Sequence, residues 1–384
     1  MNTKHLTSAA DRPKAIIIGG GVIGCAAAFE LGGAGFDCTV LDKGKLCSEA
    51  ATAAAGMLGA QVETHHPGPF YELCRISQGM YRRWTEALED TSGVSTEYIP
   101  QGILRAALTE ADEQELRSRL SWIQDARWCT PDELRELEPA LSPDIRGGLH
   151  FPADHQVHPV ALARALQAAL VKQGCKILEE TPVFRLLQEP GSGRITGVQT
   201  AEGPLYADVV VLAAGAWSPA LTEPLGLPLP MFPVKGQCIS LKPEAPLTQA
   251  TVFTKGCYIV PKADGSCLIG ATQVEAGFDK RATAAVIADL HARAAALLPG
   301  LAEAEFLSTW AGLRPGTRDG LPFMGTWEKA PGLIFATGHY RNGILLAPAA
   351  GRIVRQLALG EKPLMELAPF DPARHARING FAVL

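Results

Sequence analysis

KAIIIGGGVIGCAAAFEL, residues 14–31, places a short β-branched stretch before a glycine cluster and an apolar stretch after it. The pattern predicts a strand, a tight turn and a helix. Gly19, Gly21 and Gly24 satisfy the G-x-G-x-x-G fingerprint of dinucleotide-binding units. There the first glycine permits the turn, the second lets the backbone approach a pyrophosphate, and the third allows close helix–strand packing. The free N–H groups at the helix start would face the phosphates.

An acidic residue closes the next predicted strand. The apolar stretch Cys38–Leu41 is followed by Asp42, where a carboxylate can accept hydrogen bonds from ribose hydroxyls. This pattern fits NAD and FAD equally well. An aspartate at this position disfavours the 2′-phosphate of NADP.

Composition limits the class of protein. Hydrophobic residues make up 47% and charged residues 20% of the chain, which is typical of a globular protein with a large core. A net charge of −5 gives no basic face for a nucleic-acid partner. No apolar stretch is long enough to span a bilayer, and the polar first residues carry no secretory signal. The nine cysteines include no Cys-x-x-Cys pair, so we expect free thiols, no metal site and a cytoplasmic location.

The chain also predicts more than one domain, since 384 residues exceed the usual size of a single core. Further buried strands are expected at Ala207–Ala214 and Leu333–Thr337, with helices at Pro159–Gln173 and Pro348–Leu359. Between these segments the sequence is either amphipathic and helical or alternates like antiparallel strands.

We therefore expect an α/β fold, α+β overall, in which a Rossmann-like nucleotide domain is interleaved with an antiparallel-sheet substrate domain. The nucleotide domain would comprise residues 14–60, 151–222 and 320–370, and the substrate domain residues 61–150 and 223–319.

Seven short motifs resemble the D-amino-acid oxidase superfamily, and most closely its bacterial glycine oxidases. They occur in the matching order over nearly the whole chain: Ser48–Glu63 (SEAATAAAGMLGAQVE), Gln156–Pro159 (QVHP), Ala213–Ser218 (AAGAWS), Pro233–Gln237 (PVKGQ), Cys257–Pro261 (CYIVP), Gly312–Gly320 (GLRPGTRDG) and Gly338–Ala347 (GHYRNGILLA). The resemblance selects FAD over NAD.

The resemblance also implies which residues hold FAD. These come from the fingerprint, the loop after Asp42, the backbone near Val183 and the tail that would pass the flavin ring: Gly19, Gly21, Val22, Ile23, Gly24, Asp42, Lys43, Ala51, Thr52, Ala53, Ala54, Gly56, Met57, Leu58, Val183, Ala214, Gly215, Trp217, Arg314, His339, Arg341, Asn342, Gly343, Ile344 and Leu345. In sarcosine oxidases a cysteine tethers the flavin. No cysteine follows Arg314 here, so we expect non-covalent FAD.

For the substrate, the resemblance matches Arg314 to the carboxylate-binding arginine, Tyr258 to its hydroxyl partner, and Arg341 to a second active-site arginine, with Met57 lining the pocket. A guanidinium suits this task because its planar fork holds both carboxylate oxygens. We expect His155, His158 and His339 to be structural, since hydride transfer to flavin needs no protein base. Gly256 departs from the family, where a histidine can precede the cysteine, which leaves the preferred amine open.

The implied reaction is oxidative deamination of glycine or another small amino acid (sarcosine, N-alkyl glycines, D-alanine) to a 2-oxo acid such as glyoxylate. Dioxygen would be the second substrate and hydrogen peroxide a product. The product imine could also supply thiamine thiazole synthesis, and the family often forms homo-oligomers. Two alternatives remain: a D-amino-acid or N-substituted-glycine dehydrogenase using another electron acceptor, and a non-catalytic FAD-binding module.

Overall fold

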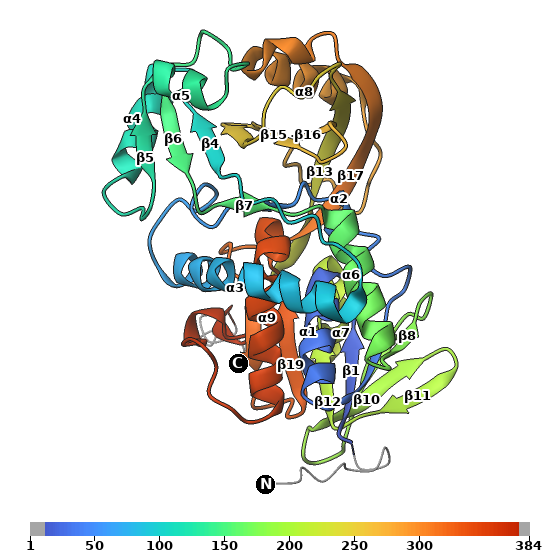
Figure 1. Ribbon diagram of the computed structural model, residues 1–384. Helices are drawn as coiled ribbons and strands as arrows, with labels where there is room; N and C mark the ends of the chain where they lie inside the picture. Colours follow the sequence, from blue (N-terminus) through green and yellow to red (C-terminus); the bar gives the residue numbers. More distant parts are fainter. Residues whose placement is uncertain (1–11, 376–384) are drawn as a thin grey trace, which may run out of the picture.

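The KAIII stretch forms a central strand of a six-stranded sheet in the computed structural model, which describes residues 12–375 (Figure 1). Strand β1 pairs in parallel with β2 on one side and β12 on the other. β19 and β8 extend the parallel sheet, and β18 closes one edge antiparallel to β19. In sheet order the strands are β18 (Phe323–Thr326), β19 (Leu333–Thr337), β12 (Val209–Leu212), β1 (Lys14–Ile18), β2 (Asp37–Leu41) and β8 (Lys176–Leu178).

Both faces of this sheet are covered, which explains why β1 is apolar from Ala15 to Ile18 instead of alternating. Ala15 and Ile17 pack into the core beneath the helices, whereas Ile16 and Ile18 pack on the opposite face. The second face is closed by a small antiparallel sheet of β9 (Arg185–Gln188), β10 (Ile195–Thr200) and β11 (Gly203–Tyr206). Gly191–Gly193 lies in the turn between β9 and β10.

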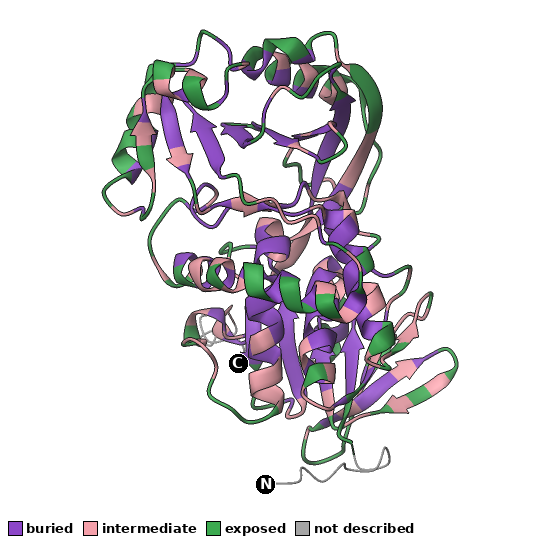
Figure 2. Cartoon of the chain, in the orientation of Figure 1, coloured by how far each residue is buried: buried purple, intermediate pink, exposed green. Residues whose placement is uncertain are grey.

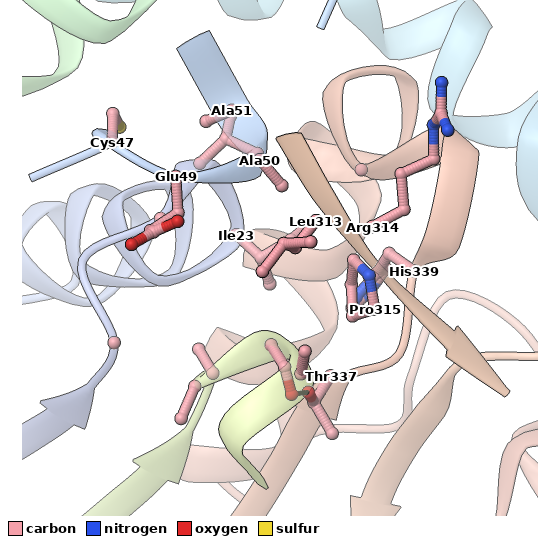
Figure 3. Close-up of a pocket in the computed structure, with 18 of the residues that line it drawn as sticks. Ile23, Cys47, Glu49, Ala50, Ala51, Leu313, Arg314, Pro315, Thr337 and His339 are labelled. Carbon is pink, nitrogen blue, oxygen red and sulfur yellow. Dashed lines mark hydrogen bonds between the residues drawn. The ribbon is translucent and has the colours of Figure 1, made fainter. Parts of the chain in front are cut away.

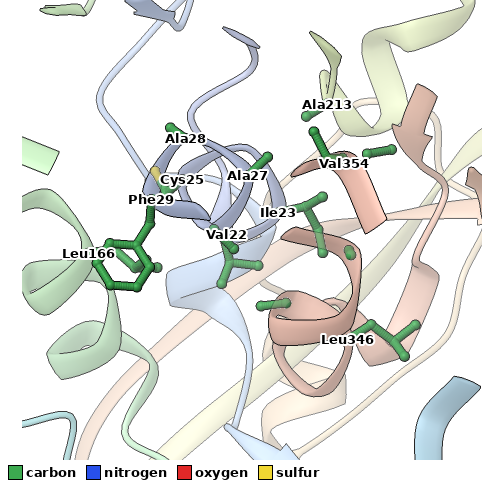
Figure 4. Packing of buried hydrophobic residues seen from close by; sticks show 14 of the residues in the cluster. Val22, Ile23, Cys25, Ala27, Ala28, Phe29, Leu166, Ala213, Leu346 and Val354 are labelled. Carbon is green, nitrogen blue, oxygen red and sulfur yellow. The ribbon is translucent and has the colours of Figure 1, made fainter. Parts of the chain in front are cut away.

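The helical layer is built around α1 (Val22–Gly33), which packs against α6 (Pro159–Lys172) and α9 (Gly343–Ala358). Figure 4 shows Leu166 of α6 beside Phe29, and Leu346 and Val354 of α9 on another side of α1. Small alanines on α1 allow this close approach, and all of Ala26, Ala27 and Ala28 are inaccessible to solvent.

The start of α9 differs from the expectation of a helix beginning at Pro348. The helix begins at Gly343, so Pro348 lies within it and the Ile344 carbonyl lacks its intrahelical donor. The Tyr81 hydroxyl donates to that carbonyl at 3.2 Å. A tertiary hydrogen bond from another helix thus compensates for the proline.

That helix is α3 (Pro69–Ser92), and its packing differs from the domain boundaries that the sequence predicts. We expected residues 61–150 in the substrate domain, yet α3 packs against α6 and α9 in the core of the nucleotide unit. Its buried side chains, such as Leu73 and Trp84, join that core because the amphipathic pattern of α3 is compatible with either partner.

The second unit contains an eight-stranded sheet in which every neighbouring pair is antiparallel except β14 and β4. Those two strands are parallel and come from different insertions of the chain. In sheet order the strands are β17 (Glu305–Thr317), β13 (Met231–Lys242), β16 (Cys267–Gly270), β15 (Cys257–Pro261), β14 (Thr251–Thr254), β4 (Ile103–Ala106), β6 (Gly148–Phe151) and β5 (Arg127–Cys129). The expected fold class, with its interleaved chain, is confirmed.

One face of this sheet packs against α8 and α5. The other face packs against Leu116 and Ile123 and against Ala55 and Val62 of the loop after the fingerprint. Several strands of the sheet are buried along most of their length (Figure 2). The remaining elements are α2 (Ala50–Ala53), β3 (Met57–Leu58), α4 (Glu110–Arg119), α5 (Pro131–Leu137), β7 (His155–Gln156), α7 (Ser218–Thr222) and α8 (Ala284–Leu297). All nine cysteines are free, in agreement with the expectation from their spacing. Within residues 12–375 no helix has both the length and the apolar character needed to cross a membrane.

Candidate active site

A cavity of about 430 Å³ lies where the carboxyl ends of the parallel strands meet the eight-stranded sheet. Gly19 follows β1, Asp42 follows β2, and Gly338 follows β19, and all three line it. This is the edge at which open parallel sheets bind ligands. Figure 3 shows Ile23 of α1, the 47–51 segment and β17 gathered around the pocket.

The three fingerprint glycines fit a bound dinucleotide. A methyl group at Gly24 would overlap the Gly19 carbonyl oxygen, so only glycine lets α1 sit this close to β1. Gly19 has φ +99°, and a methyl group there would lie 2.5 Å from the Ala213 carbonyl oxygen. At Gly21, by contrast, a methyl group would meet nothing within 4 Å and would project into open space. Gly21 is therefore where backbone can approach a phosphate directly.

The start of α1 offers the complementary electrostatics. Its N-cap residue, Gly21, provides no side-chain hydrogen bond to the first turn. The uncapped N–H groups and the positive end of the helix dipole are thus available to the phosphates of FAD. Asp42 accepts hydrogen bonds from the Gly20 and Gly44 N–H groups at 2.8 and 2.9 Å, which fixes its carboxylate at the cavity wall. Its predicted contact with the ribose remains a prediction.

Most of the residues predicted for FAD and substrate lie together on this cavity. Five predicted cofactor residues do not line it. Gly24 packs on β1, the Thr52 hydroxyl donates to the Cys47 carbonyl, and Leu58, Asn342 and Leu345 are buried in the surrounding structure. The predicted residues that do line it are Gly19, Gly21, Val22, Ile23, Asp42, Lys43, Ala51, Ala53, Ala54, Gly56, Met57, Val183, Ala214, Gly215, Trp217, Tyr258, Arg314, His339, Arg341, Gly343 and Ile344.

Arg314 projects from β17 across the neighbouring strand β13. Its guanidinium lies over Gly236, where any methyl group would overlap it. One nitrogen, Nη1, donates to the Thr272 carbonyl at 3.0 Å, and this is the one hydrogen bond that the Arg314 side chain makes within residues 12–375. No carboxylate of the described chain pairs with it, so most of its donors can bind a ligand anion.

Tyr258, on β15, lies against the same end of the cavity. Its side chain is buried, and its hydroxyl is 3.6 Å from the Cys238 sulfur. Burial raises the pKa of the Tyr258 hydroxyl well above its usual value, although Arg314 and Arg341 act in the opposite direction. The hydroxyl thus remains protonated and can donate to a carboxylate beside Arg314.

Arg341 lines the cavity but is not free. Its Nη2 lies 2.7 Å from Oε1 of Glu63, whose side chain is only 6% exposed. The Glu63 carboxylate raises the pKa of Arg341 further above its usual value. Glu63 was missing from the predicted site residues, although it is the only charged residue in the 50–63 segment and lines the cavity.

The three histidines have different surroundings. His158 caps α6 by accepting from the Ala161 N–H at 3.3 Å, and His155 contacts the Tyr98 hydroxyl, so both are structural as expected. The structural role expected of His339 stays a prediction, because its surroundings differ from those of His155 and His158. Its buried Nε2 has no hydrogen-bond partner among the described residues, and burial lowers its pKa to about 3. A neutral imidazole with a free nitrogen at the cavity wall is suited to a hydrogen bond with the cofactor.

Lys262 supports the loop around Ala55, which lines the cavity. Its Nζ donates to the Ala55 carbonyl at 2.7 Å and to Gln156 Oε1 at 3.2 Å. Burial lowers the pKa of Lys262 to about 7. The contact fixes backbone next to Gly56 and Met57, which both line the cavity.

Comparisons with known proteins agree with this geometry. A family profile described as "DAO: FAD dependent oxidoreductase" matches residues 14–357. Glycine oxidase of Geobacillus kaustophilus (strain HTA426) is 39% identical over 365 residues, which cover 94% of this chain and 96% of that protein. The crystal structure of glycine oxidase from Geobacillus kaustophilus matches with a TM-score of 0.91 and 38% identity, covering 95% of this chain and 99% of that one. The iminodiacetate oxidase of Chelativorans sp. BNC1 matches with a TM-score of 0.85 and 27% identity, covering 93% and 98%.

Proposed function

The chain belongs to the DAO family of FAD dependent oxidoreductases, and we propose that it oxidises glycine and other small amino acids, such as sarcosine, N-alkyl glycines and D-alanine. The relatives that cover nearly its whole length include enzymes named glycine oxidase. The observation that carries the proposal is the unpaired guanidinium of Arg314 beside the Tyr258 hydroxyl, in the same cavity as the dinucleotide fingerprint.

The substrate carboxylate would bind Arg314 and Tyr258. An arginine holds both oxygens of a carboxylate in its own plane, and the tyrosine hydroxyl adds a third donor. Once the carboxylate is fixed, the substrate can differ only in how the carbon that carries its amine is oriented. Met57 and the backbone beside Gly56 would restrict the space around that carbon to a small side chain.

The protein contributes orientation and exclusion of water. FAD would be held by the α1 terminus, Asp42, the 51–57 loop and His339, and when bound it supplies two-electron oxidation with dioxygen as final acceptor. His339, with a pKa of about 3, is neutral at physiological pH and adds no charge beside the substrate. The expected products are glyoxylate or another 2-oxo acid, ammonia or an amine, and hydrogen peroxide.

We also propose that the enzyme works in a reducing compartment such as the cytoplasm. All nine cysteines are free thiols, and eight of them are buried. Burial raises the pKa of several of these thiols, including Cys38 and Cys74, which keeps them protonated and unreactive.

The test is an absorption spectrum of the purified protein before and after anaerobic addition of glycine, sarcosine, N-ethylglycine or D-alanine. We expect flavin bands that one or more of these amines abolishes and that air restores, with oxygen consumed in proportion. A yellow protein that no amine bleaches would refute the substrate class. Bleaching without recovery in air would indicate a dehydrogenase that uses another electron acceptor.

A further inference from the structure

The two arginines of the cavity differ in one respect. Arg314 pairs with no carboxylate of the described chain, whereas Arg341 is neutralised by Glu63. We propose that Glu63 determines specificity by reserving Arg341, so that the site accepts amino acids with one carboxylate and rejects those with a second negative charge. This inference rests on the proposed function, because it concerns how the same site selects among amines.

Glu63 is held firmly in place by buried charges. Arg119, only 3% exposed, donates to the backbone carbonyls of residues 61, 62 and 64, two of these bonds at 2.6 Å. Asp154, fully buried, accepts the N–H groups of residues 61 and 62. Arg105 adds a bond to the Val62 carbonyl at 3.0 Å. The backbone on both sides of Glu63 is thus fixed, and the pair with Arg341 is preorganised.

The ion pair between Glu63 and Arg341 determines the net charge at this part of the cavity. Arg341 and Glu63 together carry no net charge. Of these two arginines, only Arg314 has no carboxylate partner among residues 12–375. A second carboxylate on the substrate would meet the Glu63 carboxylate, and like charges repel strongly where water is excluded. A glutamine at position 63 would leave Arg341 partly buried and without its ion-pair partner. A second carboxylate on the substrate would then supply the missing partner.

The experiment uses the FAD-loaded enzyme and two unreactive ligands of different charge, acetate and malonate. Their dissociation constants are measured from the change in flavin absorbance at about pH 8, where both carboxylates of malonate are ionised. We expect wild type to bind acetate more tightly than malonate. In Glu63→Gln the ratio of malonate to acetate affinity should rise at least tenfold. Turnover should shift in the same direction, from sarcosine toward iminodiacetate.

Three variants test the cause. Glu63→Asp keeps the charge and should keep a ratio close to that of wild type. Glu63→Gln combined with Arg341→Met removes both charges and should abolish the gain. Glu30→Gln is the matched control, since Glu30 forms a 2.8 Å ion pair with Arg352 away from the cavity and its loss should leave the ratio unchanged.

Each outcome separates this inference from the proposed function. An unchanged ratio in Glu63→Gln overturns the inference, as does wild type binding malonate more tightly than acetate. The second comparison needs no variant, so it decides the question even if Glu63→Gln fails to fold. A third outcome is that wild type oxidises neither glycine nor sarcosine, while the ratio of malonate to acetate affinity still rises in Glu63→Gln. That outcome would refute the proposed function and support the role of Glu63.

Discussion

At the scale of single residues, Arg314 is the position on which substrate binding depends most. A lysine would keep the charge but could not present two parallel donors to a carboxylate. We expect Arg314→Lys to lower kcat/KM by about a hundredfold, or about 2.7 kcal/mol, mainly through KM. FAD content should stay near that of wild type. Steady-state kinetics check this, with the exposed Arg318→Lys as control, and wild-type kinetics would show that the carboxylate binds elsewhere.

Gly236 makes the position of Arg314 possible, so a change there should act on the arginine. The methyl group of Gly236→Ala would overlap the guanidinium, which is the flexible end of its side chain and can move away. We expect at least tenfold weaker acetate binding, about 1.4 kcal/mol, with little loss of thermal stability. Gly79→Ala, at an open and exposed position of α3, is the matched control. Unchanged acetate affinity would mean that Arg314 does not bind the carboxylate.

The family resemblance predicted roles for Arg314 and Tyr258, because each stands in a short motif that matches the family. Glu63 could not be assigned in the same way. Its role depends on Arg341, which is 278 residues away in the chain. A charged residue in an otherwise small and apolar segment is the signal that could have drawn attention to it. Pairs of this kind become visible only when the backbone brings them together.

At the scale of elements, two glycines of the fingerprint turn, Gly21 and Gly24, should differ in whether an alanine affects FAD binding or stability. Gly21→Ala adds a methyl group toward the cavity and should raise the dissociation constant of FAD at least tenfold, with stability within about 1 kcal/mol of wild type. Gly24→Ala adds the same group against the Gly19 carbonyl and should cost about 3 kcal/mol by forcing α1 off β1. Cofactor titration and thermal unfolding of both apoproteins distinguish them. Equal effects on stability would contradict the assignment of Gly21 to the phosphates.

The strands and helices of the nucleotide unit were predictable because their apolar patterns are long and local. The start of α9 and the placement of α3 were not. Tyr81 and Ser77 of α3 donate to the carbonyls of residues 344 and 345, which compensates for the proline within α9. Both differences from the expected pattern therefore involve the same contact between two helices, which neither segment encodes alone.

At the scale of the whole molecule, the cavity depends on how two cores meet. Residues from the loop at 55–62 pack into the core of the eight-stranded sheet, although the loop follows the nucleotide fingerprint in the chain. The order of the strand and helix patterns predicted this interleaving, and the family resemblance agreed with it. No pattern in the sequence specified the buried polar contacts that connect the two units. Lys262 is one of these contacts, since it connects the end of β15 to Ala55 and to Gln156 of β7.

Lys262 should therefore make the stability of the molecule depend on pH. Burial lowers its pKa to about 7, although Glu97 and Asp264 favour the charged form, whereas in the unfolded chain it should titrate near 10.4. Between these values the unfolded chain binds more protons, so the contribution of Lys262 to stability rises with pH and is lost as pH falls through about 7. We therefore compare the free energies of unfolding of wild type and Lys262→Met. The value for wild type minus the value for Lys262→Met should increase by up to about 1.4 kcal/mol per pH unit between pH 7 and 10. Urea unfolding of the FAD-loaded proteins measures this difference, and Lys255→Met, at an exposed position before β15, should show no such slope. A flat difference for Lys262→Met would mean that its ammonium is not buried between the two units.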